Sequence, residues 1–158
     1  MLRPIVTAAM IAGAAPALAG IQPADGTWAG TWEMGKNEGC PQIMIDQINA
    51  TTAGERSYER RIDFPEPFDP ATMQGGDMPL EWSEVEPDVW QARYAESQAT
   101  GMGQMSVDIT SRLHILSSDA MEQEVTVNLD LPATAATMLG MAEGSCRWTT
   151  RVDHTRIE

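Results

Sequence analysis

The clearest pattern in this sequence is an alternation of apolar and polar residues in its last third. Segment 104–115 alternates polar residues with the apolar residues Met105, Val107, Ile109, Leu113 and Ile115. After a turn, segment 121–131 repeats the alternation with Val125, Val127, Leu129 and Leu131. Successive side chains of a β-strand point to opposite faces, so each segment would have one buried and one solvated face. We predict that the two segments form a long antiparallel hairpin.

Weaker strand patterns cover most of the remaining chain. Runs of strand length, separated by Gly, Pro and Asp, occur at 28–34, 42–48, 57–64, 80–85, 89–96 and 145–157. The alanine-rich segment 132–144 favours a helix, because Pro132 suits a first turn and Gly144 suits a C-terminal cap. Segment 64–79 holds four prolines and two glycines, which predicts a long surface loop.

Together these elements predict a mainly β fold. About eight strands and one short helix before the last strand follow one another without an internal repeat, so residues 20–158 are expected to form a single domain. The order of the strands favours an antiparallel meander that closes, or nearly closes, into a barrel.

The first nineteen residues have the features of a secretory signal peptide. Arg3 supplies the positive charge, residues 5–15 form a short apolar run, and Ala17-Leu18-Ala19 is a small-x-small cleavage motif. We expect cleavage between Ala19 and Gly20. The apolar run is shorter than the ~20 residues that span a bilayer, and no cysteine follows the motif to carry a lipid. The mature chain is therefore expected to be soluble, periplasmic or secreted, and not lipid-anchored.

The charge balance makes some partners unfavourable. The chain has 10 Lys and Arg against 23 Asp and Glu, and loss of Arg3 with the leader changes the formal net charge from −13 to −14. Such a surface repels phosphate backbones and anionic membranes, which disfavours nucleic-acid binding. Its ordinary role is to keep an exported protein in solution.

The two cysteines, Cys40 and Cys146, are far apart in the sequence. In an oxidising compartment they are expected to form a disulfide. A zinc half-site and a reactive thiol are the alternatives, but the chain has no C-x-x-C motif and no histidine close to either cysteine. We favour the disulfide.

The first strand carries a motif with a family resemblance. Trp28, Gly30, Trp32 and Met34 share one strand face within "WAGTWEM", and Gly30 would admit a bend between the two indoles, of which Trp32 lies further into the strand. This Gly-x-Trp opening resembles that of the calycins, the lipocalins and fatty-acid-binding proteins. The resemblance implies a barrel that holds apolar ligands, closed at one end by the Trp under an Arg from the last strand, here Arg147 or Arg151.

The resemblance has departures. No helical lid is predicted between the first two strands, where the fatty-acid-binding proteins would require one. The predicted helix precedes the last strand, whereas the lipocalins place theirs after the barrel. The chain also resembles bacterial periplasmic proteins of unknown function that begin Gly-x-Trp-Glu and carry paired cysteines, and this second resemblance implies no activity.

The sequence offers no catalytic constellation. None of the nucleophile, metallopeptidase or phosphate-binding motifs is present. His114 falls on a polar strand face, and His154 lies near the chain end, where little packing is expected. The pairs Met102/Met105 and Met138/Met141 could suit Cu(I), but core packing explains them better, with Met138 and Met141 on one side of the helix. We predict that the protein is not an enzyme and needs no cofactor or metal.

Two functions follow from these expectations. The first is an exported binding module with a small apolar ligand in the barrel interior, where Trp90 and Tyr94 would form the walls, Trp32 the floor, and Arg151 the arginine that the resemblance implies. The alternative is a structural or partner-binding envelope protein with a filled core. Its contact surface would be loop 64–79, with Phe64, Phe68, Met73 and Met78 exposed.

Overall fold

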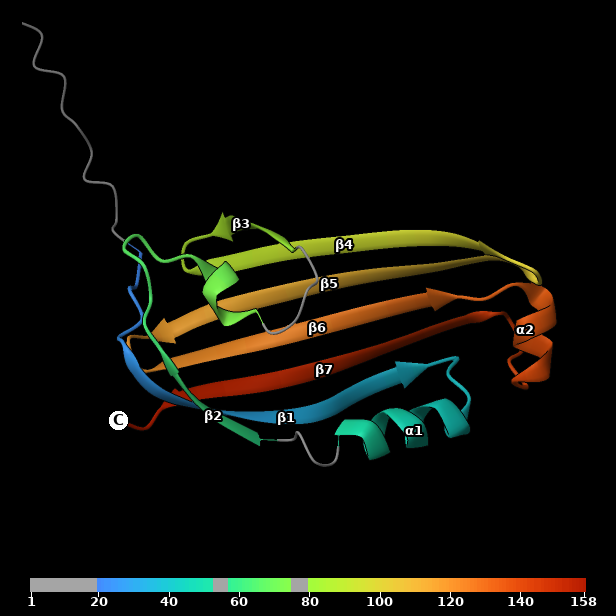
Figure 1. The fold of residues 1–158 in the computed structure, drawn as a ribbon, viewed down its shortest axis with the longest axis horizontal. Helices are drawn as coiled ribbons and strands as arrows, with labels where there is room; N and C mark the ends of the chain where they lie inside the picture. Colours follow the sequence, from blue (N-terminus) through green and yellow to red (C-terminus); the bar gives the residue numbers. More distant parts are fainter. Residues whose placement is uncertain (1–19, 53–56, 75–79) are drawn as a thin grey trace, which may run out of the picture.

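The computed structural model describes residues 20–52, 57–74 and 80–158. Its main feature is one seven-stranded antiparallel sheet with the strand order β2-β1-β7-β6-β5-β4-β3 (Figure 1). The strands are β1 Gly26–Glu38, β2 Ser57–Ile62, β3 Glu81–Glu86, β4 Val89–Thr100, β5 Gly103–Ser117, β6 Ala120–Asp130 and β7 Ser145–Arg156. The helices are α1 Gln42–Thr52, α2 Ala133–Met138 and a 3-10 turn, η1, at Pro70–Met73. The proposed leader and its cleavage site before Gly20 lie outside the described residues, except for Gly20 itself.

The predicted hairpin is confirmed. Strands β5 and β6 pair in an antiparallel register that places Ile109 opposite Val127 and Ile115 opposite Met121. Ser111, Leu113 and Ile115 are buried, whereas the intervening Arg112 and His114 are exposed. The period-two pattern therefore identified both the strands and the covered face of the sheet.

The sheet does not close into a barrel. Its order ends at β2 on one side and β3 on the other, and these two strands do not pair with each other among the described residues. Residues 63–74, which follow β2, cross one face of the sheet (Figure 1) and bury Phe64 and Phe68 there. Side chains from these residues cover this part of the face.

Segment 42–48 is a helix, so its prediction as a strand was wrong. Helix α1 directs Met44, Ile45 and Ile48 inward while Ile43 is 68% exposed, which is the spacing of a helical stripe. The carbonyl of Pro41 accepts hydrogen bonds from the N–H groups of Met44 and Ile45. Proline before the first turn favours helix entry, and this signal outweighs the alternation of the two isoleucines. The strand count falls from eight to seven for this reason. The expectation that no helix lies between the first two strands was also wrong, because α1 lies between β1 and β2.

Helix α2 lies before the last strand as predicted, but it is shorter than segment 132–144. It ends at Met138, and Gly140 adopts a left-handed φ of 70° directly after it. A left-handed glycine is the usual terminator of a helix, so Gly140 takes the role that was expected of Gly144. Met138, the last residue of the helix, is 77% exposed, whereas Met141 lies beyond the helix and is 8% exposed. The two methionines therefore do not lie on one side of the helix, contrary to the prediction.

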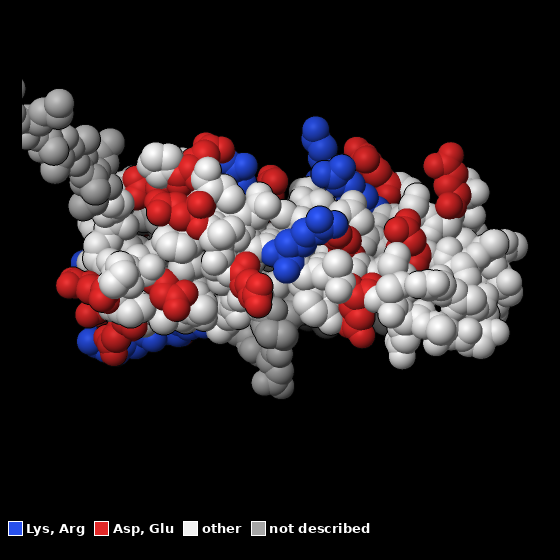
Figure 2. Space-filling model, turned by 90° about the horizontal axis from the view of Figure 1, so that it is seen from above, with Lys and Arg blue, Asp and Glu red and all other residues white. Residues whose placement is uncertain are grey.

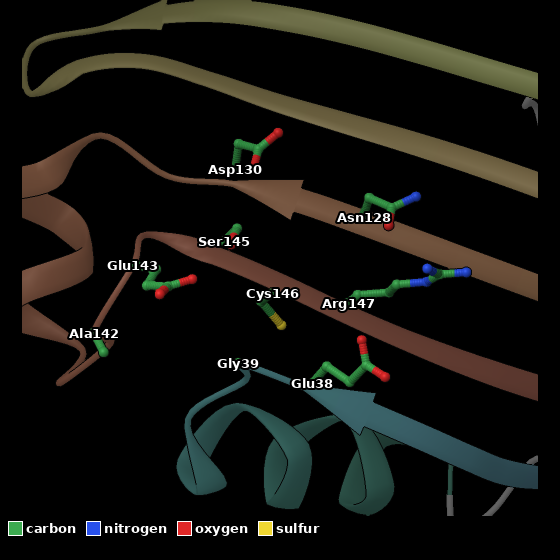
Figure 3. Close-up of a pocket in the computed structure, with 9 residues that line it drawn as sticks. All are labelled: Glu38, Gly39, Asn128, Asp130, Ala142, Glu143, Ser145, Cys146 and Arg147. Atoms are coloured by element: carbon green, nitrogen blue, oxygen red, sulfur yellow. The ribbon is translucent and has the colours of Figure 1, made fainter.

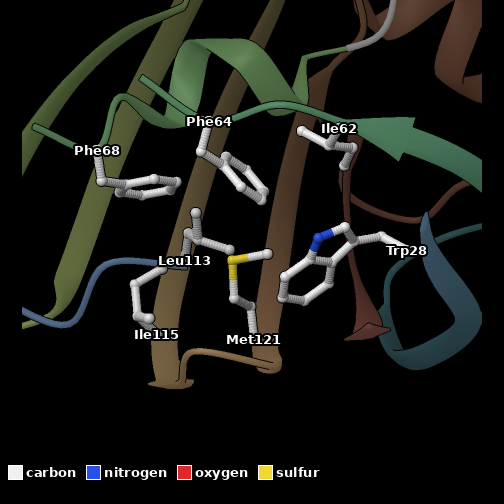
Figure 4. Packing of buried hydrophobic residues seen from close by; sticks show 7 residues of the cluster. All are labelled: Trp28, Ile62, Phe64, Phe68, Leu113, Ile115 and Met121. Atoms are coloured by element: carbon white, nitrogen blue, oxygen red, sulfur yellow. The ribbon is translucent and has the colours of Figure 1, made fainter. Parts of the chain in front are cut away.

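The larger core lies under the crossing segment at one end of the sheet. It contains Trp28, Ile62, Phe64, Phe68, Leu113, Ile115 and Met121 (Figure 4). The ring of Phe64 packs edge-on against Trp28, with centroids 5.6 Å apart, and tilts against Phe68 at 5.5 Å. Phe64 and Phe68 are therefore core residues, and the expectation that they are exposed on a contact loop was wrong. Met73 packs against the same cluster, while Met78 lies outside the described residues.

A smaller core lies at the other end, where α1 and α2 pack (Figure 1). It is built from Ala136, Met141 and Cys146, with Met44 and Trp148 among the residues that pack against it. Cys40 and Cys146 form a disulfide across 106 residues, as predicted, and join the chain just after β1 to the start of β7. The covered face of the sheet thus has a packed cluster at each end.

Candidate functional site

Between the two cores, the covered face of the sheet carries a row of half-buried apolar side chains. Trp148, Val127, Ile109 and Tyr94 lie directly opposite one another across β7, β6, β5 and β4. Each is neither fully buried nor fully exposed. We call these four residues the apolar row. Half-exposed apolar surface of this kind across several strands is typical of a contact site for an apolar group.

The two rows beside the apolar row differ in polarity. On the side of the larger core lie Thr150, Val125, Ser111 and Ala92, of which two carry hydroxyl groups. On the other side Cys146, Leu129 and Val107 form the next row, which ends at the exposed Glu96. The hydroxyl of Tyr94 donates a hydrogen bond to the Glu96 carboxylate, and this bond raises the pKa of Tyr94. The Glu96 carboxylate thus places a negative charge beside the Tyr94 end of the apolar row.

Three predicted ligand residues share this face but do not converge on one point. Trp32, Trp90 and Tyr94 all belong to the covered face, as their register partners Val152, Leu113 and Ile109 show. Trp32 on β1 and Tyr94 on β4 are separated by four strand spacings, or about 19 Å. Trp90 packs against the larger core, with its ring 5.9 Å from that of Phe68. Of the three, Tyr94 belongs to the apolar row.

The arginines proposed to cover the tryptophans lie on the other face. Arg151 is opposite Glu33 in register and pairs with Glu122 at 2.9 Å and with Asp153 at 3.0 Å. Its guanidinium is thus held among carboxylates on the polar face, away from Trp32. The arginine that is in register with a first-strand tryptophan is Arg156, opposite Trp28.

A buried polar chain next to the larger core was missed by the sequence reading. The hydroxyl of Tyr58 contacts His154 Nδ1 at 2.5 Å, His154 Nε2 contacts Gln123 Oε1 at 3.3 Å, and Gln123 Nε2 donates to Ser111 Oγ at 2.8 Å. His154 is 4% exposed and Ser111 is 1% exposed. With the amide in this orientation, His154 carries its proton on Nε2 and accepts from Tyr58 at Nδ1.

Gly30 makes this polar chain possible. It lies in register between Tyr58 on β2 and His154 on β7, so the tyrosine must cross β1 to reach the histidine. A Cβ at position 30 would lie 2.0 Å from Tyr58 Cε1, which shows that the ring rests on the glycine itself. Gly30 is therefore a place of close approach rather than only a point of bending. The sequence alone could not show that Gly30, Tyr58 and His154 lie side by side, because this depends on the register of three strands.

The electrostatics of this chain favour a neutral imidazole. Burial, assisted by the positive charge of Arg60, lowers the pKa of His154 to about 4. Burial also raises the pKa of Tyr58. The Arg60 guanidinium lies 5.2 Å from the Tyr58 ring centroid and donates to the carbonyl of Met73 at 2.6 Å. Both ring nitrogens of His154 are engaged and Ser111 contacts Gln123 rather than the histidine, so the arrangement is not a Ser–His dyad.

A pocket among the described residues lies beside the disulfide rather than on the apolar row. It has a volume of about 550 Å³ and its lining includes Glu38, Asp130, Glu143 and Arg147 (Figure 3). These charged groups do not suit an apolar ligand. Among the described residues, no three His, Cys, Asp or Glu side chains are placed to hold a metal ion.

Two of the methionines that the sequence suggested as Cu(I) ligands are exposed at one end of the molecule. Met138 and Met102 are 77% and 51% exposed, on α2 and the β4–β5 turn. Figure 2 shows acidic side chains spread over the side of the molecule that is in view, whereas the end that carries these two elements is largely uncharged. The Cu(I) question is not tested by this geometry.

Comparisons with protein-family models, with curated proteins and with solved structures found no match. Within the described part of the chain, no helix is both long and apolar enough to cross a membrane. The disulfide is compatible with an extracytoplasmic location.

Proposed function

We propose that this protein is a non-catalytic, exported binding protein that holds a small neutral apolar molecule on the covered face of its sheet. The observation that carries the proposal is the apolar row, which starts at Trp148 beside the smaller core and continues over Val127, Ile109 and Tyr94, all four of them half-buried. The ligand would lie across the strands on an open face, not inside a closed barrel.

The energetics favour an occupant with a flat or elongated apolar surface. Covering apolar surface contributes roughly 25 cal/mol per Å², and an apolar row that spans four strands presents side chains over about 14 Å. Toward the smaller core the next row continues with Val107, Leu129 and Cys146, so an occupant of the apolar row would extend the apolar surface of that core. The opposite face, with residues such as Arg112, Glu124 and Arg151, is polar and exposed.

The charge of the protein selects against anionic ligands. The formal net charge is −13 for the full sequence, and Glu96 marks the tyrosine end of the apolar row. A carboxylate or phosphate head would be repelled at that end. We therefore assign the site to neutral apolar molecules rather than to fatty-acid anions.

The alternative of a partner-binding envelope protein receives less support. Its contact surface was to be loop 64–79, yet Phe64 and Phe68 are 7% and 8% exposed and fill the larger core. A loop whose aromatic residues are buried offers little apolar surface to a partner.

A fluorescent-probe titration tests the ligand proposal. The neutral probe N-phenyl-1-naphthylamine should bind the exported protein with increased emission, and Ile109→Asp should abolish this because a carboxylate would enter the apolar row. Thr110→Asp is the matched control, since Thr110 is the next residue of β5, is also half-buried, and faces the other side. Binding should survive in the control. Equal loss in both variants, with both folded by circular dichroism, would contradict the proposal.

Charge preference gives a second readout of the same site. A neutral long-chain alcohol should displace the probe at lower concentration than the fatty acid of equal chain length at pH 7. Preferential displacement by the fatty acid would overturn the assignment to neutral ligands.

A further inference from the structure

The residues that follow the predicted cleavage site are seated firmly on one end of the sheet. The N–H of Ile21 donates to Asp88 Oδ1 at 2.5 Å, and the N–H of Ala24 donates to the carbonyl of Ser118 at 2.8 Å. Pro23 is among the side chains that are less than 2% exposed. The chain thus occupies a defined position directly from Gly20 onward.

Hydrogen bonds of its own backbone hold Asp88, which faces this segment, in position. It adopts a left-handed φ of 62° in the turn between β3 and β4. Its N–H donates to Glu84 Oε1 at 3.2 Å, and its carbonyl accepts from the N–H of Ile115 at 2.8 Å. Aspartate tolerates the left-handed conformation better than most residues do. Its carboxylate is therefore held toward Gly20 and Ile21.

The surroundings of Gly20 are acidic. A pocket of about 480 Å³ includes Gly20, Glu66, Glu84 and Asp88 in its lining, and no Lys or Arg lines it. A Cβ at Gly20 would lie 3.2 Å from Asp88 Oδ1 and 3.9 Å from Glu84 Oε1. The Cα of Gly20 therefore lies next to the carboxylates of Asp88 and Glu84. These carboxylates lack a cation among the lining residues.

We propose that cleavage before Gly20 supplies this cation, and that the new α-ammonium group forms an ion pair with Asp88 and Glu84. Hydrolysis of the Ala19–Gly20 peptide bond consumes one water, leaves a carboxylate on Ala19 and releases the amine of Gly20, which is protonated at neutral pH. Two independent observations meet here, the small-x-small motif that ends at Ala19 and the acidic seat of Gly20.

Leader removal would then complete the fold as well as release the chain. Before cleavage the nitrogen of Gly20 belongs to a neutral amide, and the carboxylates of Glu84 and Asp88 accept hydrogen bonds only from backbone N–H groups among the bonds described above. After cleavage, the positive charge lies where the terminal segment meets the β3–β4 turn. The mature protein is therefore more stable than a chain with a blocked terminus, whether or not a ligand binds the apolar row.

The composition of the chain makes a direct test possible. Lys36 is the only lysine, so the mature protein has two amines, the α-amine of Gly20 and the ε-amine of Lys36. Reductive methylation with ¹³C-formaldehyde labels both amines and leaves them titratable, and Lys36→Arg identifies the Gly20 signal by difference. The protein is expressed with its own leader and purified after export, and its N-terminal sequence should begin Gly-Ile-Gln.

We expect the pKa of the Gly20 amine to lie about 1 unit or more above the usual range of about 7.7–8.0. Asp88→Asn should remove most of this shift while it keeps the turn conformation and the acceptor for Ile21. Glu124→Gln is the control, because it removes one charge from an exposed position of β6 and should leave the shift unchanged.

A second measurement uses stability. Acetylation of the α-amine should raise the equilibrium constant of unfolding about tenfold, the equivalent of one pKa unit, in the wild type and not in Asp88→Asn. An α-amine that titrates in the usual range in the wild type would overturn the proposal, and so would an exported chain that begins at another residue. The wild-type titration decides the matter even if Asp88→Asn does not fold.

Discussion

Trp28 and Trp32 occupy equivalent positions in the strand alternation but differ in burial. Trp28 is 0% exposed, packs against Phe64 and donates from its indole nitrogen to the carbonyl of Ala24 at 3.1 Å. Trp32 is only half-buried. The expectation that Trp32 is the deeper of the two is thus reversed.

The consequence for stability is specific. Trp28→Ala should cost about 3–5 kcal/mol, the range for truncation of a buried aromatic residue, and Trp32→Ala should cost clearly less. Gly30→Val should also destabilise, because its side chain would displace the Tyr58 ring. Denaturant unfolding of the three variants with the disulfide intact measures this. A larger loss for Trp32→Ala than for Trp28→Ala would contradict the packing described here.

His154 gives the protein a predictable response to acid. Its pKa is lowered from 6.5 to about 4 in the folded state, so the unfolded chain takes up a proton first as the pH falls. Stability is therefore complete above pH 6.5 and decreases toward pH 4, by about 2 kcal/mol between pH 6.5 and pH 5. Urea unfolding over this interval should show a weaker pH dependence for His154→Gln than for the wild type. His114→Gln, at an exposed position of β5, should behave as the wild type, and equal slopes in all three proteins would refute the assignment.

At the scale of elements, the long strands could be read from the sequence and the short ones only in part. Segment 104–115 predicts β5 because it alternates over many residues, and its polar face is solvated. Segment 42–48 was misread because Ile43 and Ile45 alternate in a run too short to distinguish a strand from a helix. Pro41 was the signal that decided the matter.

The positions of the candidate site residues were harder to predict, because they depend on the register between strands. Tyr94 and Trp32 were placed on the covered face correctly, but the pattern could not show that three strands lie between them. His154 looked thinly packed at the chain end. Its burial arises because the segment after β2 crosses the sheet and because Gly30 lets Tyr58 reach across β1. No local pattern contains that information.

At the scale of the whole molecule, the disulfide joins two strands that are already paired. It closes a loop with a sequence separation of 106 residues, for which the chain-entropy model gives up to about 4.7 kcal/mol. Replacement of both Cys40 and Cys146 by alanine should cost about 2–5 kcal/mol. Denaturant unfolding checks the magnitude, and thiol alkylation of natively exported protein checks the bond. Two alkylatable cysteines in that protein would contradict it.

The open sheet leaves the covered face accessible along its middle, and the two cores hold that face in shape from either end. In this arrangement the larger core, the polar chain at His154 and the disulfide stabilise the sheet, and we propose that a ligand covers the apolar row.

Native mass spectrometry of the protein, purified after export in its own host, tests this claim most directly. The account predicts a co-purifying mass of a neutral apolar molecule in the wild type and in Thr110→Asp, and its absence in Ile109→Asp. A protein that carries no bound mass and binds no neutral apolar probe, or one whose bound mass persists in Ile109→Asp, would contradict the account.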